Sequence, residues 1–329
     1  MAEMIMRNSP VSPDAWPALP YTEWADTLAT LHMWTQIVGK LRLTLSPWLN
    51  QSWHVSSYVT ARGMSTSTMP CGDKLLQIEF DFIDHALKIA VSDGQTRSLP
   101  LKPQTVADFY NELMASLESL GIAVQIHGSP NEVEEAIPFA QDTVHKTYDK
   151  QQANLLWQAL AQSTRVLDQF RARFTGKCSP VQFFWGSFDL AVTRFSGRPA
   201  PAHPGGAPNC PDRVMVEAYS EEVASVGFWP GNAEAPEPIF YSYIYPTPAG
   251  FAESSVLPDA AFWLADLGEF ALPYEAVRSS KNPDATLTDF LQSTYGAAAD
   301  LADWDRARLE RPVGYTPANP HGSGHGRGQ

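Results

Sequence analysis

The chain has 329 residues, of which 44% are hydrophobic and 18% charged, and its 23 Lys and Arg against 36 Asp and Glu give a net charge of −13. This composition excludes disorder for most of the chain. The acidic balance gives no general support to nucleic-acid binding or to an anionic membrane surface as a partner. No run of about 18 apolar residues occurs, so we expect no membrane-spanning helix. At roughly 100–200 residues per domain, the length predicts one large or two medium domains.

The cysteines and the two ends bear on the cellular compartment. Cys71, Cys178 and Cys210 are widely spaced and form no CxxC pair, which favours a reducing cytoplasm over a disulfide framework. The N-terminal stretch lacks an apolar segment, so we expect no secretory signal. Residues 1–20 are expected to be an extended lead-in, and residues 311–329, rich in Gly, Pro and His, a disordered tail.

Two segments of the first half have the apolar periodicity of amphipathic helices. Residues 22–49 place apolar side chains three and four apart until Pro47 ends the pattern. Residues 105–121 repeat this spacing, with Thr105 as the expected N-cap and Gly121 as the C-terminal cap. We therefore expect a long opening helix and a shorter closing helix in this half.

Between these helices the pattern changes to the alternation that is typical of strands. Residues 52–67 are rich in aromatic and β-branched side chains, which favours a half-buried strand. Residues 75–101 alternate strictly and contain two turn candidates, Asp84-His85 and Asp93-Gly94. These residues predict antiparallel strands joined by tight turns.

The second half repeats this order, with an expected helix over 149–174 and an aromatic-rich strand region over 179–197. We therefore predict an α+β fold of two sequentially duplicated halves, each with a long helix, an antiparallel sheet of three or four strands and a closing helix. One further helix is expected over 214–224, inside a proline-rich insertion. The expected organisation is a lead-in at 1–20, a first half at 21–126, a linker at 127–148, a second half at 149–310 with the insertion at 198–238, and a tail at 311–329.

Several long strings are distinctive: TLATLHMWTQIVGK, FDFIDHALKI, GKCSPVQFFWGSFDLAVTRFSG, GFWPG, PAGFAES and FLQSTYGAAADLADWDR. In these strings the chain resembles a bacterial family described as a domain of unknown function, from about Trp16 to about Glu310. The resemblance implies a bacterial, soluble, single-chain protein. It supplies no catalytic residues, so the functional hypotheses depend on the chemistry of the side chains.

An acid and a basic residue stand among aromatic residues in the second half. Asp189 and Arg194 lie five positions apart on a strand-like stretch, on opposite faces if the strand is regular and on one face if a bulge intervenes. The two residues either pair as a buried bridge or hold a carboxylate, phosphate or amide substrate. Arg62 occupies the matching place in the first half, so we expect the two arginines to converge on a small anionic ligand.

Three histidines are candidates for proton transfer. His32 lies near the apolar stripe of the first helix, His54 on the first expected strand, and His203 in a flexible Gly-Pro stretch that is expected to cap the site. For each of them a structural role is the alternative. His32, His54 and Asp81 would also suit a metal ion, but no HExxH motif occurs and a metal is disfavoured. The cofactor therefore stays open.

Other candidates are aromatic or acidic. Trp185 and Tyr243 are expected to line an aromatic pocket with Glu253 at its rim. Cys178 is expected near a helix C-terminus, where the helix dipole disfavours a thiolate, so we interpret it as a structural thiol. No phosphate-binding GxxxxGK[ST] or GxGxxG string occurs.

These residues support three hypotheses. The first is an enzyme acting on a small anionic or amide-bearing metabolite, in which Arg62 and Arg194 hold the substrate, His32 or His54 transfers protons and Asp189 orients the histidine. The second is a non-catalytic small-molecule binding protein with the same pocket. The third is an interaction or scaffold protein that uses exposed Trp and Pro patches such as GFWPG. A small-molecule ligand is the expected partner in the first two, and the sequence leaves the oligomeric state open.

Overall fold

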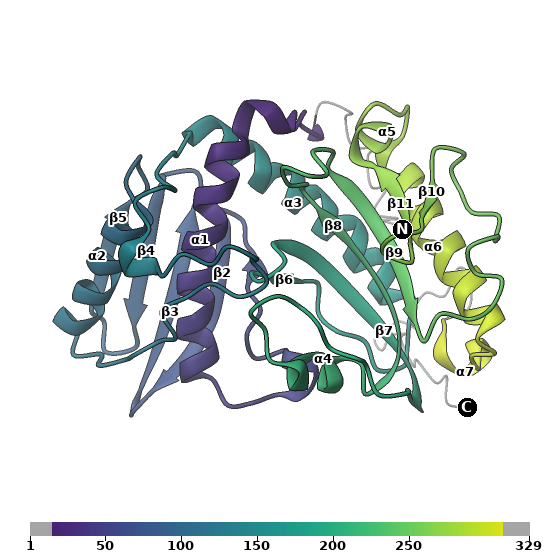
Figure 1. The fold of residues 1–329 in the computed structure, drawn as a ribbon, viewed down its shortest axis with the longest axis horizontal. Coiled ribbons are helices and arrows are strands. Elements are labelled where there is room, and N and C mark those ends of the chain that lie inside the picture. The colour runs from purple at the N-terminus through teal and green to yellow at the C-terminus, as the bar shows by residue number, and fades with distance from the viewer. Residues whose placement is uncertain (1–14, 312–329) are drawn as a thin grey trace, which may run out of the picture.

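The computed structural model describes residues 15–311 and shows a mixed α+β fold with two antiparallel sheets (Figure 1). The first sheet has the strand order β1-β2-β3-β4-β5. Each strand pairs with its neighbour in the sequence, as the expected hairpins require. Its strands are β1 (Tyr58–Val59), β2 (Gly63–Cys71), β3 (Lys74–Asp81), β4 (Ala86–Val91) and β5 (Thr96–Pro100).

The second sheet has six strands in the order β10-β11-β9-β8-β7-β6. Its strands are β6 (Gln182–Phe184), β7 (Asp189–Pro199), β8 (Glu221–Trp229), β9 (Ile239–Tyr245), β10 (Phe262–Leu264) and β11 (Glu269–Pro273). The two sheets meet at their edges, where Ser57 and Phe183 exchange backbone hydrogen bonds of 2.9 and 2.7 Å. This bridge brings the loop after the first helix beside β6.

The helices cover the sheets and leave one face of the second sheet open to a cavity. They are α1 (Tyr21–Leu45), α2 (Val106–Ser119), α3 (Lys150–Ala172), α4 (Asp212–Ala218), α5 (Tyr274–Arg278), α6 (Pro283–Leu301) and α7 (Arg306–Leu309), with short 3-10 turns η2 (Asn50–Ser52) and η3 (Phe139–Gln141). Helices α3 and α6 contact β7 and β9 of the second sheet, and α1 contacts β2 of the first. Figure 1 shows the small helix α4 in front of the second sheet, opposite α3.

The local signals behind the regular elements are visible in the structure. The Thr105 side chain accepts a hydrogen bond from the Asp108 N–H and caps α2, and Gly121 follows the helix with φ 74°. Leu76 and Ile78 of β3, with Phe82 just after it, are completely buried, as the alternation predicts. No helix in residues 15–311 is long and apolar enough to cross a membrane.

Two segments differ from the prediction. Residues 52–56 form a turn rather than a strand, because η2 and the bonds from Trp53 to Asn50 and Val55 to Ser52 close the chain on itself. The expected insertion at 198–238 contains β8, a central strand, and the helix expected over 214–224 ends at Ala218. The sheets therefore have five and six strands instead of three or four. The expected lead-in up to residue 14 and the tail from residue 312 lie outside the described residues.

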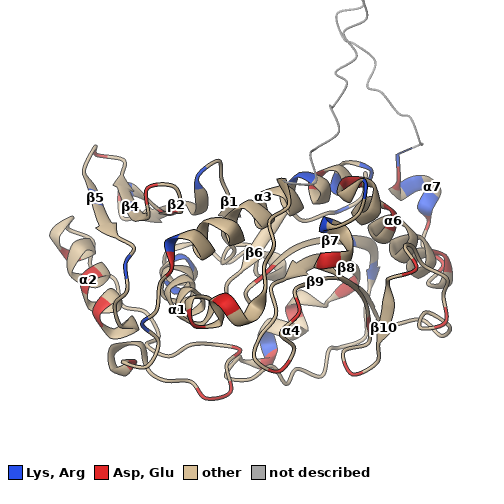
Figure 2. Cartoon of the chain, turned by 90° about the horizontal axis from the view of Figure 1, so that it is seen from above, with Lys and Arg blue, Asp and Glu red and all other residues tan. Residues whose placement is uncertain are grey.

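Figure 2 shows acidic positions spread over elements of both sheets rather than gathered on one of them. The net charge of the chain is therefore not concentrated at a single surface. The charges that matter for the site described next are a few side chains around one cavity.

Candidate functional site

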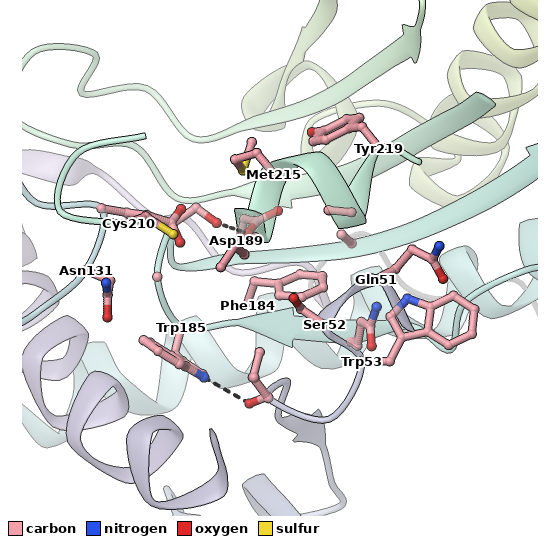
Figure 3. Close-up of a pocket in the computed structure, with 18 of the residues that line it drawn as sticks. Gln51, Ser52, Trp53, Asn131, Phe184, Trp185, Asp189, Cys210, Met215 and Tyr219 are labelled. Atoms are coloured by element: carbon pink, nitrogen blue, oxygen red, sulfur yellow. Dashed lines mark hydrogen bonds between the residues drawn. The ribbon is translucent and has the colours of Figure 1, made fainter. Parts of the chain in front are cut away.

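A cavity of about 570 Å³ lies on the open face of the second sheet, under α4 and beside η2 and α1. Its walls are rich in aromatic side chains: Trp48, Trp53, Phe184, Trp185, Phe195, Tyr219, Tyr241 and Tyr243. Figure 3 shows Trp185 and Phe184 on one side of the cavity, Met215 and Tyr219 of the α4 region on the other, and Asp189 between them. A cavity of this size with a few polar groups is typical of a small-molecule site.

The regular alternation of β7 decides which side chains enter the cavity. Asp189, Ala191 and Thr193 line it, whereas Arg194 points to the opposite face, where its guanidinium lies 3.4 Å from the Phe170 ring centroid. The register of β7 against β8 is unbroken from Leu190 to Phe195, and the irregularity follows only after that. No bulge therefore brings the acid and the arginine to one face.

Asp189 is a buried carboxylate at the floor of the cavity. The Ser187 hydroxyl donates to its Oδ1 and the Tyr241 hydroxyl to its Oδ2, both at 2.5 Å. Among the described residues no Lys, Arg or His lies within ion-pair distance of it. Burial raises the pKa of Asp189 above its usual value, against the opposing effect of the two hydroxyl donors.

Glu132 enters the cavity from the segment that the sequence predicts as a linker. Its backbone has φ 58°, in the left-handed region that a glutamate seldom adopts, and its N–H donates to the Pro208 carbonyl at 2.8 Å. The carboxyl lies against Gly186, where an added Cβ would be 2.0 Å from Glu132 Oε1. Glu132 is exposed to solvent, although many protein atoms surround its carboxyl, and desolvation together with the charge of Asp189 raises its pKa to about 7.

Helix α1 holds the segment that carries Glu132. The buried Gln36 side chain donates to the Asn131 carbonyl at 2.7 Å and accepts from the Asn131 N–H at 2.8 Å. Lys40, one turn later, donates to Asn131 Oδ1, and the Asn131 amide donates in turn to the Asn209 carbonyl. The backbone before Glu132 is therefore fixed on one side by α1 and on the other by the chain that leads into α4.

Lys40 is the basic group whose charge acts on Glu132 and favours its ionised form. It is buried, and its ammonium lies 5.5 Å from the Trp185 ring centroid, a cation–π distance. Desolvation lowers the pKa of Lys40 to about 8, opposed by the charges of Cys210 and Glu132. Lys40 and Glu132 thus both change protonation near neutral pH.

Tyrosine hydroxyls continue the floor beyond Asp189. The Tyr219 and Tyr243 hydroxyls lie 2.8 Å apart, and those of Thr193 and Ser225 lie 2.9 Å apart. Farther along the same face, burial and the charge of Asp189 raise the pKa of Glu269 to about 7. The floor therefore combines hydroxyls with carboxyl groups that repel one another.

The chain around α4 covers the cavity. His203 stacks on Tyr219, with ring centroids 4.5 Å apart, and its Nδ1 accepts from the Gly205 N–H at 3.1 Å. The Trp48 indole donates to the Glu217 carboxylate at 2.8 and 2.9 Å. His203 thus packs on Tyr219 next to the cavity but is not among the residues that line it, and its capping role stays a prediction.

The other two candidate histidines lie outside the cavity lining. His32 Nε2 lies 2.8 Å from the Gly186 carbonyl, to which we assign it as the donor; desolvation lowers the pKa of His32 to about 4, so the ring is neutral at pH 7. It supports the loop against which Glu132 lies. His54 Nδ1 accepts from the Leu49 N–H at 3.2 Å and its ring packs 4.6 Å from that of Trp48.

The expected convergence of the two arginines does not occur. Arg62 pairs with Asp81 at 2.5 Å and with Asp84 at 2.7 Å, beside the first sheet. Arg194 is 1% exposed, donates to the Phe170 carbonyl and contacts the rings of Phe170, Phe174 and Tyr295 between β7 and the helices behind it. Neither guanidinium lines the cavity.

Of the remaining candidate residues, two line the cavity and two lie away from it. Trp185 and Tyr243 line the cavity, and the Trp185 indole donates to the Val55 carbonyl at 2.9 Å, the bond drawn in Figure 3. Glu253 is exposed in the loop after β9, away from the lining residues. Asp81 is buried among Arg62 and Lys88.

The site residues outside the prediction come from segments that carry no local signal. Glu132 and Asn131 belong to a stretch without regular structure, and Lys40 appears in the sequence as one more residue of an amphipathic helix. The positive φ of Glu132 distinguishes this residue from its neighbours, but a backbone angle cannot be read from the sequence. Over residues 15–311 no group of three or more His, Cys, Asp and Glu side chains is arranged to hold a metal ion, and the set of His32, His54 and Asp81 is dispersed.

Cysteine chemistry has no support in the geometry of the described chain. Cys71, Cys178 and Cys210 are free thiols. Burial raises the pKa of Cys178 to about 11, which keeps it protonated at pH 7 and agrees with a structural thiol.

The fold and the cavity define an α+β protein with an aromatic-walled pocket that carries carboxyl groups. The chain belongs to the family of unknown function DUF5996, whose model matches residues 16–311. Comparison with curated proteins and with solved structures found no match.

Proposed function

We propose that this protein binds a small organic molecule in the cavity beneath α4. The observation that carries the proposal is the cavity itself: about 570 Å³, walled by Trp, Phe and Tyr, with Asp189 and Glu132 among its polar groups. Such a cavity buries an apolar body against the rings and orients it through its polar end. Asp189 and Glu132, both acceptors when ionised, favour a ligand whose polar end donates hydrogen bonds.

Of the ligand classes expected from the sequence, an amide-bearing molecule suits this cavity better than an anion. The arginines that the anion hypothesis requires lie elsewhere, and carboxyl groups occupy the floor. An amide N–H would donate to Asp189 or Glu132, and its carbonyl would accept from a tyrosine hydroxyl or from Lys40.

A cavity-filling variant tests the proposal. Ala218 lines the cavity from α4, whereas Val216 on the same helix is exposed and outside the lining. In ligand-observed NMR against a library of small amides and amines, the natural protein and Val216→Trp should retain the same ligands and Ala218→Trp should lose them. Equal binding by both variants would place the ligands outside this cavity and contradict the proposal.

A second candidate, an enzyme that transfers a proton at Glu132, is favoured by one observation. Glu132 has a pKa of about 7 inside the cavity, close to the value that suits a general acid or base. Turnover of a bound ligand, followed by mass spectrometry and abolished in Glu132→Gln at ligand concentrations that saturate this variant, would support the enzyme. Retention of the unchanged ligand by the natural protein would support the binding protein.

The wider expectations belong to the same proposal. Binding of a small metabolite, rather than of nucleic acid or membrane, agrees with the acidic composition. Bacterial origin, a cytoplasmic location and an internal duplication of the two halves stay predictions, as does the scaffold hypothesis for the GFWPG segment.

A further inference from the structure

The charges at the cavity floor point to the chemical class of the ligand. Asp189 is buried, and each of its oxygens accepts one bond from a neutral hydroxyl, from Ser187 and from Tyr241. A carboxylate has about four acceptor positions, so it can accept further donors from the cavity side. A buried carboxylate is normally compensated by a cation, and no described Lys, Arg or His side chain pairs with Asp189.

Two further carboxyl groups act on the same floor. Glu132 has neither a hydrogen bond nor an ion pair from its carboxyl to any other described residue, and Glu269 of β11 lies farther along the same face of the sheet, outside the residues that line the cavity. The charge of Asp189 opposes the ionisation of both of them. The basic groups of the lining are Lys40, whose ammonium is held by Asn131 at the α1 side, Arg213, which is exposed on α4, and His127, which is exposed and has its Nδ1 3.3 Å from the Ser129 carbonyl.

The aromatic lining adds to this preference for positive charge. Tyr219, Tyr241 and Tyr243 surround the floor, and Trp53 and Trp185 stand in the facing wall. The faces of these rings are electron-rich and attract an organic cation within about 6 Å of the ring centre, most strongly where water is excluded. Carboxylates and ring faces together form the recognition chemistry of an ammonium group.

We propose that the ligand of this cavity carries an ammonium group, which binds between Asp189 and Glu132 with its apolar body against the tryptophan and tyrosine rings. This inference rests on the proposed function and deepens it, since it assigns a charge to the polar end of the ligand. A primary ammonium donates three hydrogen bonds, enough for the open acceptor positions of Asp189 and the unpaired carboxyl of Glu132.

Three probes with one phenylethyl body separate the possibilities: 2-phenylethylammonium, 3-phenylpropanamide and 3-phenylpropanoate. We expect calorimetry at pH 7.5 to show the ammonium binding at least about tenfold more tightly than the amide and the carboxylate, because a desolvated charge pair contributes more than a neutral hydrogen bond. Loss of this binding in Ala218→Trp and its retention in Val216→Trp would place it in the cavity.

Charge-neutralising variants then test the two carboxyl groups. Glu132→Gln should weaken binding of the ammonium probe by about tenfold and leave binding of the amide unchanged, while Glu134→Gln, an exposed control in the same segment, should change neither. Asp189→Asn should act like Glu132→Gln, provided that its circular dichroism and unfolding transition show the native fold. If Asp189→Asn does not fold, the binding data of Glu132→Gln alone decide the outcome.

The outcomes distinguish failure of the ammonium inference from failure of the proposed small-molecule binding. Equal or tighter binding of the amide or the carboxylate within the cavity would overturn the ammonium inference and leave the small-molecule function intact. Tight ammonium binding that Glu132→Gln and a folded Asp189→Asn both leave unchanged would also overturn it. If none of the three probes bound in a way that Ala218→Trp abolishes, both proposals would fail.

Discussion

The side chain of Gln36 in α1 brackets the backbone of Asn131, with its amide donating to the Asn131 carbonyl at 2.7 Å and its oxygen accepting from the Asn131 N–H at 2.8 Å. The two residues are 95 positions apart in the chain. This pair of bonds fixes the segment immediately before Glu132, so a buried residue outside the cavity determines where a cavity carboxyl lies.

Replacing Gln36 by Met keeps the length of the side chain and removes both bonds. We expect the free energy of unfolding to fall by about 2 kcal/mol, because a buried backbone group left without a partner costs about 1–3 kcal/mol. We also expect ligand binding to weaken, because Glu132 loses its fixed position. Urea unfolding and calorimetry measure the two effects. Gln151→Met, at an exposed position of α3, is the control, and a Gln36 variant as stable as the natural protein would contradict the expectation.

Gly186 leaves the space that the Glu132 carboxyl occupies. An added Cβ at Gly186 would lie 2.0 Å from Glu132 Oε1, so Gly186→Ala should displace the carboxyl while the fold adapts at a cost below about 1 kcal/mol, as the end of a flexible side chain can move. We expect the affinity for the ammonium probe to fall toward that of Glu132→Gln.

The control for this experiment is Gly128→Ala, where an added Cβ meets no atom within 4 Å. It should leave both stability and binding unchanged. Unchanged binding in Gly186→Ala would show that the Glu132 carboxyl does not act from the position against Gly186.

The sequence predicts those parts of the molecule whose signals are local. Helices α1, α2 and α3 follow from apolar spacing, and the β3–β4 hairpin from alternation. Asp189, which lines the cavity, is a candidate from the sequence because a carboxylate stands among aromatic residues in a strand. Strand β8 was not predicted, because VMVEAYSEEVA at 214–224 also has helical spacing and only the pairing with β7 and β9 decides between the two.

The rest of the site depends on long-range contacts that no local pattern contains. Glu132 lines the cavity because the bonds of Asn131 to Gln36 and Asn209 fix the backbone immediately before it. A common site for Asp189 and Arg194 requires a bulge between them, whereas the regular pleat of β7 puts residues five apart on opposite faces, which is the other alternative that the sequence allows. The pairing of β7 with β8 therefore places Asp189 and Arg194 on opposite faces of the sheet, although the two residues are close in the sequence.

Arg194 offers a test of this separation. Its guanidinium is buried against Phe170 and Tyr295, and burial lowers its pKa to about 10. Arg194→Met removes a buried charge that no described carboxylate pairs with, so we expect the free energy of unfolding to change by less than about 1 kcal/mol, since the loss of ring contacts is offset by the lost desolvation cost. Arg194→Lys should be the less stable variant, because an ammonium lacks the planar stacking of the guanidinium.

Both Arg194 variants should bind the cavity ligand as the natural protein does, because their side chains lie behind β7. Thermal unfolding and calorimetry measure the two properties. A large loss of affinity in a folded Arg194→Met variant would mean that Arg194 contributes to ligand binding, which would contradict its position behind β7.

Glu132 makes the stability of the unliganded protein depend on pH. The ordinary glutamate pKa of 4.5 applies to the unfolded chain, whereas the folded value is about 7, so the folded protein holds this proton more tightly. Stability contributed by the protonated form is therefore fully present below pH 4.5 and is lost as the pH rises to 7. Glu132→Gln cannot ionise, so its free energy of unfolding relative to the natural protein should increase between pH 4.5 and 7 and then level off. Water in the cavity screens the charge, which limits the change to below about 1 kcal/mol. Urea unfolding of both proteins at pH 4.5, 6, 7 and 8 measures the difference. A constant or decreasing difference would contradict a raised pKa of Glu132.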